Sequence, residues 1–297
     1  MPIPGVVEVD AHFLEDAAAT ARPMRCRVIE EDTLTLDIED IGLYTLMWTP
    51  TMECSVAHGY TPDAGLLGDI NESESLAIAA GFALSEGFIR RREDIRSLSV
   101  CPDSHRVVRI QLHEPEKVQT NRRNVVINSS CGICGPREIL ENGDPALRPV
   151  ATRRLALQTD DIARLMGEMR RRQALFEVTG GCHGAAIFDE QGRILAVAED
   201  LGRHNALDKV IGKVLLSRGE LSGCGVILSS RLSVEMVLKT IRTGLEVMLA
   251  VSAPTSMAIE LAARYGVTLC GFVRDQRATI YTHPERILTH QAGVQTA

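Results

Sequence analysis

Two cysteines separated by two residues are the strongest candidates for chemistry in this sequence. Cys131 and Cys134 lie in the segment NSSCGICGP at residues 128–136. Glycines on both sides allow backbone amides to approach the sulfur atoms, and such dipoles stabilise a thiolate. The thiolate is the form of cysteine that attacks sulfur and binds metals. The segment therefore predicts a solvent-facing pair of nucleophilic thiols.

Three kinds of chemistry use a Cys-x-x-Cys pair, and a pair of inert thiols is the alternative to all of them. The pair can supply half of a zinc site, act as a redox dithiol or carry a persulfide. Tetrahedral zinc needs four ligands, usually from a second close pair, and the sequence has no other Cys-x-x-Cys. It also lacks a His-x-Glu followed by Pro-Cys-x-x-Cys, the signature of zinc deaminases. We therefore expect no metal ligands and no zinc.

A second polar cluster has the sequence EDLGRHNALDK at residues 199–209, between a predicted strand and a predicted helix. Ligand sites of open α/β sheets collect at the carboxyl ends of strands, where helix amino termini favour anions. The planar guanidinium of Arg203 suits a phosphate or a carboxylate, and His204 can transfer protons near neutral pH. The same segment can equally form a helix cap with an Asp/Lys network that holds two elements together. Composition does not choose between the two.

Other polar turns of this kind recur along the chain. SSRLS at 229–233 and SAPT at 252–255 each follow a predicted strand and begin a predicted helix, and TGGCH at 179–183 is a glycine-rich turn at a strand edge. Free backbone amides at a helix start suit an anion, although N-capping is the simpler role and a lone His183 is more often structural. Three junctions in one sheet predict a shared binding surface. Neither a GxGxxG loop nor a Walker loop is present.

The elements that must position these groups are those of an α/β protein. Beyond Val150 the pattern predicts strands at 185–188, 193–198, 225–229, 245–251 and 267–274, and helices at 159–175, 205–217, 233–243 and 255–265. Gly219 and Gly266 stand where a glycine that ends a helix is expected. Strands that alternate with helices of this length predict βαβ units packed on one sheet.

The first part of the chain predicts a smaller, mixed domain. Strands are expected at 27–37, 43–48 and 107–112, a helix at 76–88, and a loop or short helix at 51–74. Asn, Gly, Pro and Ser cluster between the two parts. The predicted organisation is therefore a strand-rich α+β domain at 1–118, a flexible linker at 119–149 that carries the two cysteines, and an α/β domain at 150–297.

Composition excludes several classes of protein. The 297 residues are 45% hydrophobic and 24% charged with a net charge of −7, which is typical of a globular chain and argues against a nucleic-acid-binding role. No segment reaches the roughly 18 apolar residues of a membrane span, and the first residues lack the pattern of a signal peptide. We therefore expect a cytoplasmic protein whose eight cysteines form no disulfide framework.

With these motifs in place, the chain resembles the FdhD/NarQ family of formate dehydrogenase accessory sulfurtransferases. The resemblance is strong over about residues 120–283 and looser over 25–112. The motifs that carry it are SCGICG at 130–135, TGG at 179–181 with His183, EDLGRHNALDK at 199–209, RLS at 231–233 with Glu235 and Met236, SAPT at 252–255 and GFVR at 271–274.

The resemblance implies a function for particular residues. Cys131 would receive sulfane sulfur from a cysteine desulfurase as a persulfide, with Cys134 as an assisting or resolving thiol. The sulfur would go to the bis(molybdopterin guanine dinucleotide) molybdenum cofactor, bound as a substrate, before formate dehydrogenase receives it. A guanine nucleotide would mimic this cofactor. The cofactor site would comprise Phe272, Val273, Arg274, Asp275, Gln276 and Arg277, together with Arg203 and His204 from the polar cluster.

The family also implies a fold and an assembly. We expect a cytidine-deaminase-like, three-layer carboxyl-terminal domain without the deaminase zinc ligands, in a homodimer. Two departures from the family pattern stand out: the segment 51–74 is longer than usual, and Cys182 replaces an apolar residue. Two alternative functions stay open, namely a non-catalytic chaperone that binds the molybdenum cofactor and a zinc hydrolase of the deaminase type.

Overall fold

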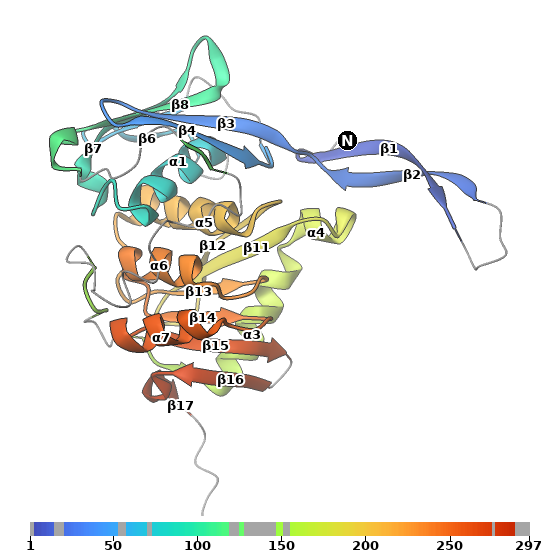
Figure 1. Cartoon of the computed structure of the whole chain (residues 1–297), viewed down its shortest axis with the longest axis vertical. Coiled ribbons are helices and arrows are strands. Elements are labelled where there is room, and N and C mark those ends of the chain that lie inside the picture. The colour runs from blue at the N-terminus through green and yellow to red at the C-terminus, as the bar shows by residue number, and fades with distance from the viewer. Residues whose placement is uncertain are drawn as a thin grey trace, which may run out of the picture.

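A six-stranded sheet forms the centre of the second half of the chain (Figure 1). The computed structural model describes residues 3–14, 21–52, 58–69, 73–118, 125–127, 147–150, 155–274 and 277–288. The strands of this sheet and the helices that connect them are, in chain order, β11 (His183–Phe188), β12 (Ile194–Asp200), α5 (Arg203–Arg218), β13 (Gly225–Leu228), α6 (Val234–Thr243), β14 (Val247–Ala250), α7 (Ser256–Tyr265), β15 (Thr268–Arg274) and β16 (Arg277–Thr282). The strand order is β12-β11-β13-β14-β15-β16, with β13, β14 and β15 parallel and the other pairs antiparallel. The predicted βαβ units are confirmed.

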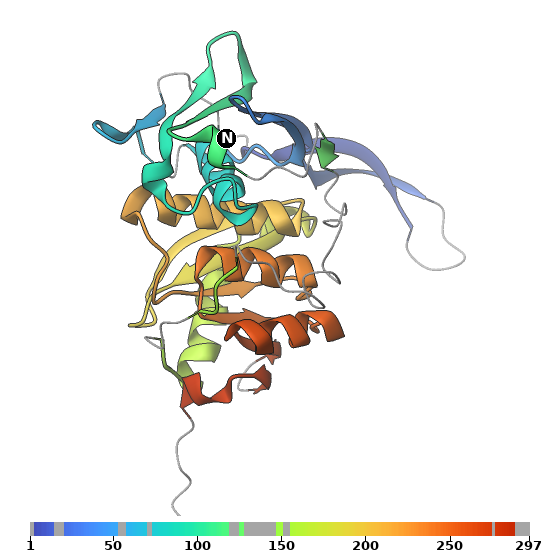
Figure 2. The same ribbon diagram turned by 60° about the vertical axis from the view of Figure 1, so that its left-hand side comes forward.

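Helices cover both faces of this sheet. Both views show α5, α6 and α7 side by side along one face (Figure 1, Figure 2). The other face packs against α3 (Thr159–Arg171), which precedes the short helix α4 (Ala174–Thr179). Ile227 faces α3, whereas its neighbours Val226 and Leu228 face α5 and α6. Because both faces of β13 are covered, its sequence is a continuous run of apolar residues.

A second sheet of seven strands holds most of the first half of the chain. Its strands are β3 (Asp32–Ile38), β4 (Gly42–Trp48), β5 (Gly59–Thr61), β6 (Gly65–Leu67), β7 (Ile95–Cys101), β8 (Ser104–Leu112) and β9 (Val125–Ile127), in the order β6-β5-β7-β8-β3-β4-β9. Helix α1 (Glu74–Ser85), all of whose residues are buried, lies between this sheet and α5 (Figure 1). The rings of Tyr44, Phe82 and Phe88 pack together at 5.2–5.8 Å between centroids. One continuous core thus joins the sheet to the βαβ units.

Helices α1 and α5 cross in backbone contact at two glycines. A Cβ atom on Gly81 would lie 1.8 Å from the carbonyl oxygen of Asp208, and one on Gly212 would lie 1.7 Å from that of Ala77. Any side chain at either position would therefore force the helices apart. Gly81 weakens the helix in isolation, but the tertiary contact requires it.

A two-stranded arm projects from the body of the protein (Figure 1). It consists of β1 (Val6–Phe13) and β2 (Arg22–Ile29), paired antiparallel. Exposed ion pairs such as Arg25 with Glu8 link its strands at 3.6 Å, and exposed pairs of this kind add little stability. The amide of Glu30 donates to the carbonyl of Gly5 at 2.8 Å and fixes the base of the arm.

Several sequence predictions are corrected by this fold. The strand predicted at 27–37 is divided between two strands, because β2 ends at Ile29 and β3 begins at Asp32 as the chain passes from the arm into the sheet. The loop or short helix predicted at 51–74 contains the hairpin β5–β6, with 53–57 and 70–72 outside the described residues. The helix predicted at 159–175 is divided between α3 and α4.

The α/β fold class is confirmed, whereas the cytidine-deaminase-like arrangement stays a prediction. The remaining short elements are the 3-10 turns Arg92–Asp94, Pro115–Lys117 and Pro284–Arg286, and the parallel pair β10 (Leu157–Gln158) and β17 (Ile287–Leu288). Gly219 and Gly266 end α5 and α7 in the left-handed conformation, as predicted. Among the described residues, no helix is both long and apolar enough to cross a membrane.

Candidate functional site

The predicted polar junctions gather at one edge of the six-stranded sheet. Strands β13, β14 and β15 end at this edge, which we call the carboxyl edge (on the right of Figure 1, where the arrow of β15 points). The antiparallel register pairs His183 at the start of β11 with Asp200 at the end of β12, and Ala185 with Leu228. The described residues that border this edge are therefore 179–183, 199–205, 229–233, 252–255, 272–274 and 277.

Arg203 and His204 occupy the first turn of α5, which Gly202 precedes as N-cap. The Nε atom of Arg203 is buried and has no hydrogen-bond partner among the described residues. Burial raises the pKa of the nearby Glu235 carboxyl, but the Ser233 hydroxyl, a backbone amide and the charges of His204 and Arg203 outweigh it, so the pKa lies below its ordinary value. The site thus combines the Arg203 Nε–H group, which has no acceptor among the described residues, with the ionised Glu235 carboxylate.

His183 lies beside this group, at the start of β11. Its Nδ1 is 3.5 Å from the Ser229 hydroxyl, which accepts a hydrogen bond from the amide of Gly184 at 2.9 Å. Burial, and then the charge of Arg203, lower the pKa of His183 below its ordinary value against the opposing effect of Asp200. The imidazole is therefore neutral near pH 7. His183 and Ser229 were absent from the predicted site residues, although both stand in polar junctions that the sequence analysis identified.

The rest of the cluster at 199–209 is structural. The Asp200 carboxylate accepts from the amides of Thr49 (3.0 Å) and Gly202 (2.9 Å) and from the side chain of Asn205 (2.9 Å). Lys209 lies 3.0 Å from Asp200 and donates to the Thr49 carbonyl at 2.7 Å. The end of β4 is thereby fixed to the start of α5. The structural interpretation of the cluster is confirmed for Asp200 and Lys209, whose network supports the turn that carries Arg203. The ligand-binding role of Arg203 stays a prediction.

Buried ion pairs extend this network between the helices. Lys209 also contacts Glu74 of α1 at 3.1 Å, and Lys239 of α6 contacts Asp208 at 2.8 Å and Glu86 at 3.0 Å. Breaking one partner of such a buried pair is strongly destabilising, because the other charge stays buried without compensation. The network thus fixes the position of α5 relative to α1 and α6.

The β15–β16 hairpin borders the other end of the carboxyl edge. Phe272 adopts a positive φ of 52° with 48% of its surface exposed, and its amide donates to the Ser252 carbonyl at 3.2 Å. Val273 is buried on the α3 side of the sheet, so its backbone but not its side chain faces the edge. Arg274 and Arg277 pair across the hairpin, both exposed. The predicted site residues Asp275 and Gln276 lie outside the described residues.

Three strand spacings separate β11 from β15, so His183 and Phe272 lie about 14 Å apart along the edge. The edge offers guanidinium groups, hydroxyls and helix amino termini between these points, and an exposed aromatic ring at one end. Such a surface suits an elongated anionic ligand with a planar base.

The predicted catalytic residues Cys131 and Cys134 lie outside the described residues. The five described cysteines are free, and all except Cys26 are buried. Burial raises the pKa of Cys224 to about 11 and that of Cys270 to about 12. Burial, and then the Glu199 carboxylate, raise the pKa of Cys182 as well, and its thiol lies 3.3 Å from that carboxylate. These three thiols are therefore poor nucleophiles.

Comparison with known proteins identifies relatives over most of the chain. The model of the FdhD/NarQ family matches residues 72–288. The sulfur carrier protein FdhD of Thermoplasma acidophilum is 35% identical over 283 residues, which cover 94% of this chain and 90% of the relative. The protein of the same name from Bordetella petrii is 40% identical over 214 residues, covering 70% and 76%. A crystal structure from Desulfotalea psychrophila, described as that of a formate dehydrogenase accessory protein, matches with a TM-score of 0.71 and 25% identity over 96% of this chain and 100% of that one.

Proposed function

The chain belongs to the FdhD/NarQ family, and from this premise we propose that it is a sulfur carrier in the maturation of a molybdenum-dependent formate dehydrogenase. It accepts sulfane sulfur on Cys131 from a cysteine desulfurase and delivers it to the bis(molybdopterin guanine dinucleotide) cofactor. The observation that carries the proposal is the similarity to sulfur carrier proteins over nearly the whole chain. A cytoplasmic homodimer with a cytidine-deaminase-like second domain belongs to the same proposal.

Sulfur uptake is a thiol exchange. The Cys131 thiolate attacks the outer sulfur of the persulfide on the desulfurase, a new S–S bond forms, and the desulfurase cysteine leaves as a thiolate while the proton stays on the transferred sulfur. The rate of such an exchange depends on the thiolate fraction and on access to the sulfur. Glycines at 132 and 135 favour both requirements.

Sulfur delivery uses the second thiol. The Cys134 thiolate attacks the inner sulfur of the Cys131 persulfide, which forms a Cys131–Cys134 disulfide and releases the outer sulfur as hydrosulfide to the cofactor. The two thiols supply the two electrons that reduce sulfane sulfur to sulfide. A dithiol reductant then reopens the disulfide before the next cycle.

The carboxyl edge is the proposed binding surface for the cofactor as a substrate. The residues there fit its chemistry, because the Arg203 guanidinium keeps a buried donor without a partner among the described residues. Arg274 and Arg277 add positive charge for the phosphates, and Phe272 offers a ring on which guanine can stack. The span of about 14 Å between His183 and Phe272 suits an extended dinucleotide.

The persulfide is tested by intact-protein mass spectrometry after incubation with a cysteine desulfurase and cysteine, followed by peptide mapping. We expect a reducible gain of one sulfur atom on the peptide that holds Cys131. Cys131→Ala should abolish this gain, and Cys134→Ala should retain it because release is blocked. Cys26→Ala is the matched control, since this thiol lies on the arm, and it should behave like the wild type.

An unmodified Cys131 peptide, with the desulfurase shown to be active, would reject the persulfide mechanism. A cellular assay distinguishes sulfur transfer from the remaining alternative, a non-catalytic cofactor chaperone. If Cys131→Ala restores formate dehydrogenase activity to cells that lack the carrier, the protein is a non-catalytic cofactor chaperone. Loss of activity in that variant supports sulfur transfer.

A further inference from the structure

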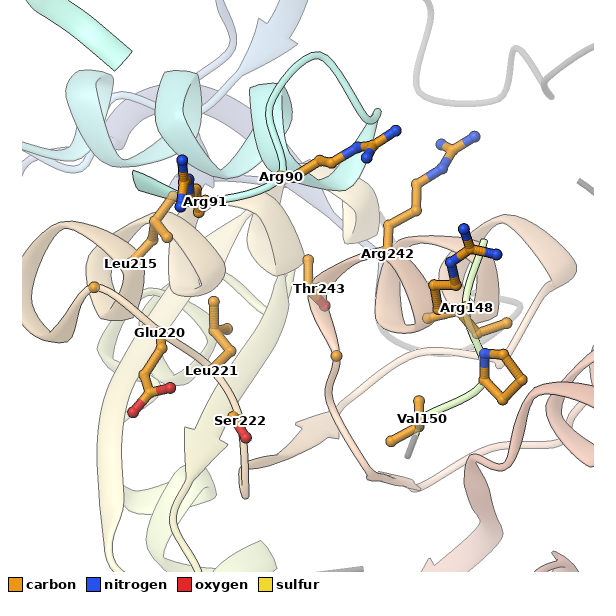
Figure 3. A pocket seen from close by; sticks show the side chains of 14 residues that line it. Arg90, Arg91, Arg148, Val150, Leu215, Glu220, Leu221, Ser222, Arg242 and Thr243 are labelled. Carbon is orange, nitrogen blue, oxygen red and sulfur yellow. The ribbon is translucent and has the colours of Figure 1, made fainter. Parts of the chain in front are cut away.

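A pocket of about 340 Å³ opens at the edge of the six-stranded sheet opposite to the carboxyl edge. The carboxyl ends of α5 and α6, the turn after α1 and residues 148–150 line it (Figure 3). Its position separates it from Arg203 and from the β15–β16 hairpin, because strands β13 and β14 begin near the pocket and end at the carboxyl edge. None of the motifs of the proposed sulfur carrier contributes to its lining.

Four arginines line this pocket, and two of them have partners that hold them in the fold. Arg91 pairs with Asp94 at 3.3 Å, and Arg242 donates to the carbonyl of Ser85 at 3.1 Å. The side chains of Arg90 and Arg148 have no carboxylate partner among the described residues, and both residues are exposed.

The backbone presents Arg90 in a fixed position. The Asp94 carboxylate accepts hydrogen bonds from the amides of Arg90 at 2.7 Å and Arg91 at 3.1 Å, which fixes the turn after α1. Figure 3 shows the guanidinium groups of Arg90, Arg148 and Arg242 gathered on one side of the pocket, although they come from three separate segments. Glu220 is the single carboxylate among the described lining residues, and it points away from them (Figure 3).

The wall of the pocket below these arginines is apolar. Leu215, Leu221 and Ile241 line it, and each is at most 4% exposed. A planar guanidinium fork matches a phosphate or a carboxylate in geometry. A volume of this size lies within the range of small-molecule sites, whereas protein interfaces are broad surfaces of about 800 Å² per partner. The occupant that fits is therefore a small anion with an apolar or planar portion.

We propose that this pocket binds a small phosphorylated metabolite, whose phosphate groups Arg90 and Arg148 contact while the apolar wall contacts the rest of the molecule. This site goes beyond the sulfur carrier function and does not depend on it.

Isothermal titration with pyrophosphate at constant ionic strength tests the proposal on the full-length protein. The double variant Arg90→Gln/Arg148→Gln should bind pyrophosphate at least about tenfold more weakly, since each charge-assisted hydrogen bond contributes about this factor or more. Arg171→Gln is the matched control, because it removes one exposed charge from α3 and should leave the affinity unchanged. Thermal unfolding should show equal stability for all variants.

Three results would overturn the proposal. The first is no binding of pyrophosphate up to millimolar concentration. The second is an affinity that Arg274→Gln reduces but the double variant does not, because pyrophosphate then binds only at the carboxyl edge. The third is displacement of pyrophosphate by a tetraglutamate peptide at equal concentration, which would reassign the pocket to an acidic segment of a protein partner.

Discussion

The contact between α1 and α5 predicts that Gly81→Ala destabilises the protein, in the opposite direction to helix propensity. Alanine in place of glycine inside a helix normally stabilises by about 1 kcal/mol. Here the new Cβ atom would lie 1.8 Å from the carbonyl oxygen of Asp208. An ordinary contact is 3.4 Å or more, so the helices must separate by about 1.6 Å. Neither side can relieve the clash by a rotamer change, because the obstacle is backbone.

The expected magnitude follows from these two effects. Overpacking of a core costs about 1–3 kcal/mol and occasionally more, and a rigid backbone contact on a wholly buried helix belongs at the upper end. After the gain in propensity, the net loss should be about 2 kcal/mol in the free energy of unfolding. This is a large fraction of the roughly 5–15 kcal/mol that typically stabilises a domain.

Urea unfolding followed by circular dichroism measures this loss, and a second glycine provides the control. Gly167 lies inside α3, where a new Cβ atom would meet only the flexible end of Arg171 at 3.4 Å. Gly167→Ala should therefore gain about 0.5–1 kcal/mol. If Gly81→Ala proves as stable as the wild type, or gains as much as the control, the reasoning from backbone contact is refuted.

Three further predictions concern the charges around α5. Lys209→Met leaves the Glu74 and Asp200 carboxylates buried without their shared cation, so it should cost about 3–5 kcal/mol in urea unfolding; a loss below about 1 kcal/mol would contradict this. Burial raises the pKa of Glu74, but Lys209 and Lys213 outweigh burial and lower the pKa below its ordinary value of 4.5. The ionised Glu74 carboxylate therefore stabilises the fold above pH 4.5, and this stabilisation disappears as the pH falls through the lower pKa of the folded state. Glu74→Gln should accordingly flatten the pH dependence of the thermal midpoint in that acidic range, and an unchanged slope would argue against it. Arg203→Gln should weaken the binding of guanosine diphosphate about tenfold, as measured by calorimetry. The thermal midpoint should not fall, because the Nε atom of Arg203 makes no hydrogen bond within the described residues. An unchanged affinity would remove Arg203 from the proposed binding surface.

Local signals in the sequence sufficed for most of the second half of the chain. The helices α5, α6 and α7 each end at a glycine that adopts the left-handed conformation, and apolar strands lie between them. These signals depend on neighbouring residues only, so the βαβ pattern and the position of the polar junctions at strand ends followed from sequence. Strands β1, β7 and β16 were not predicted, although β1 alternates apolar and polar residues from Val7 to Phe13.

Within the polar cluster at 199–209, the residue types were evident from the sequence but their separate roles were not. The Asp200 carboxylate accepts from the amide of Thr49, and Lys209 donates to the Thr49 carbonyl, although Thr49 lies 151 and 160 positions away along the chain. Arg203, in the first turn of the helix that carries Lys209, keeps a buried donor at the carboxyl edge. Whether a polar side chain supports the fold or faces a ligand therefore depends on contacts that are remote in sequence.

Helix periodicity, glycine caps and strand ends are local properties, and they were enough to predict the α/β class, the order of the βαβ units and the segments from which a site could be built. Three other features became visible only in the folded chain: Gly81 must lack a side chain, Asp200 and Lys209 support α5, and Arg90 and Arg148 meet in one pocket. Each of them arises from burial, close packing or charge pairing between elements that are distant along the chain. No local pattern encodes which of these elements meet.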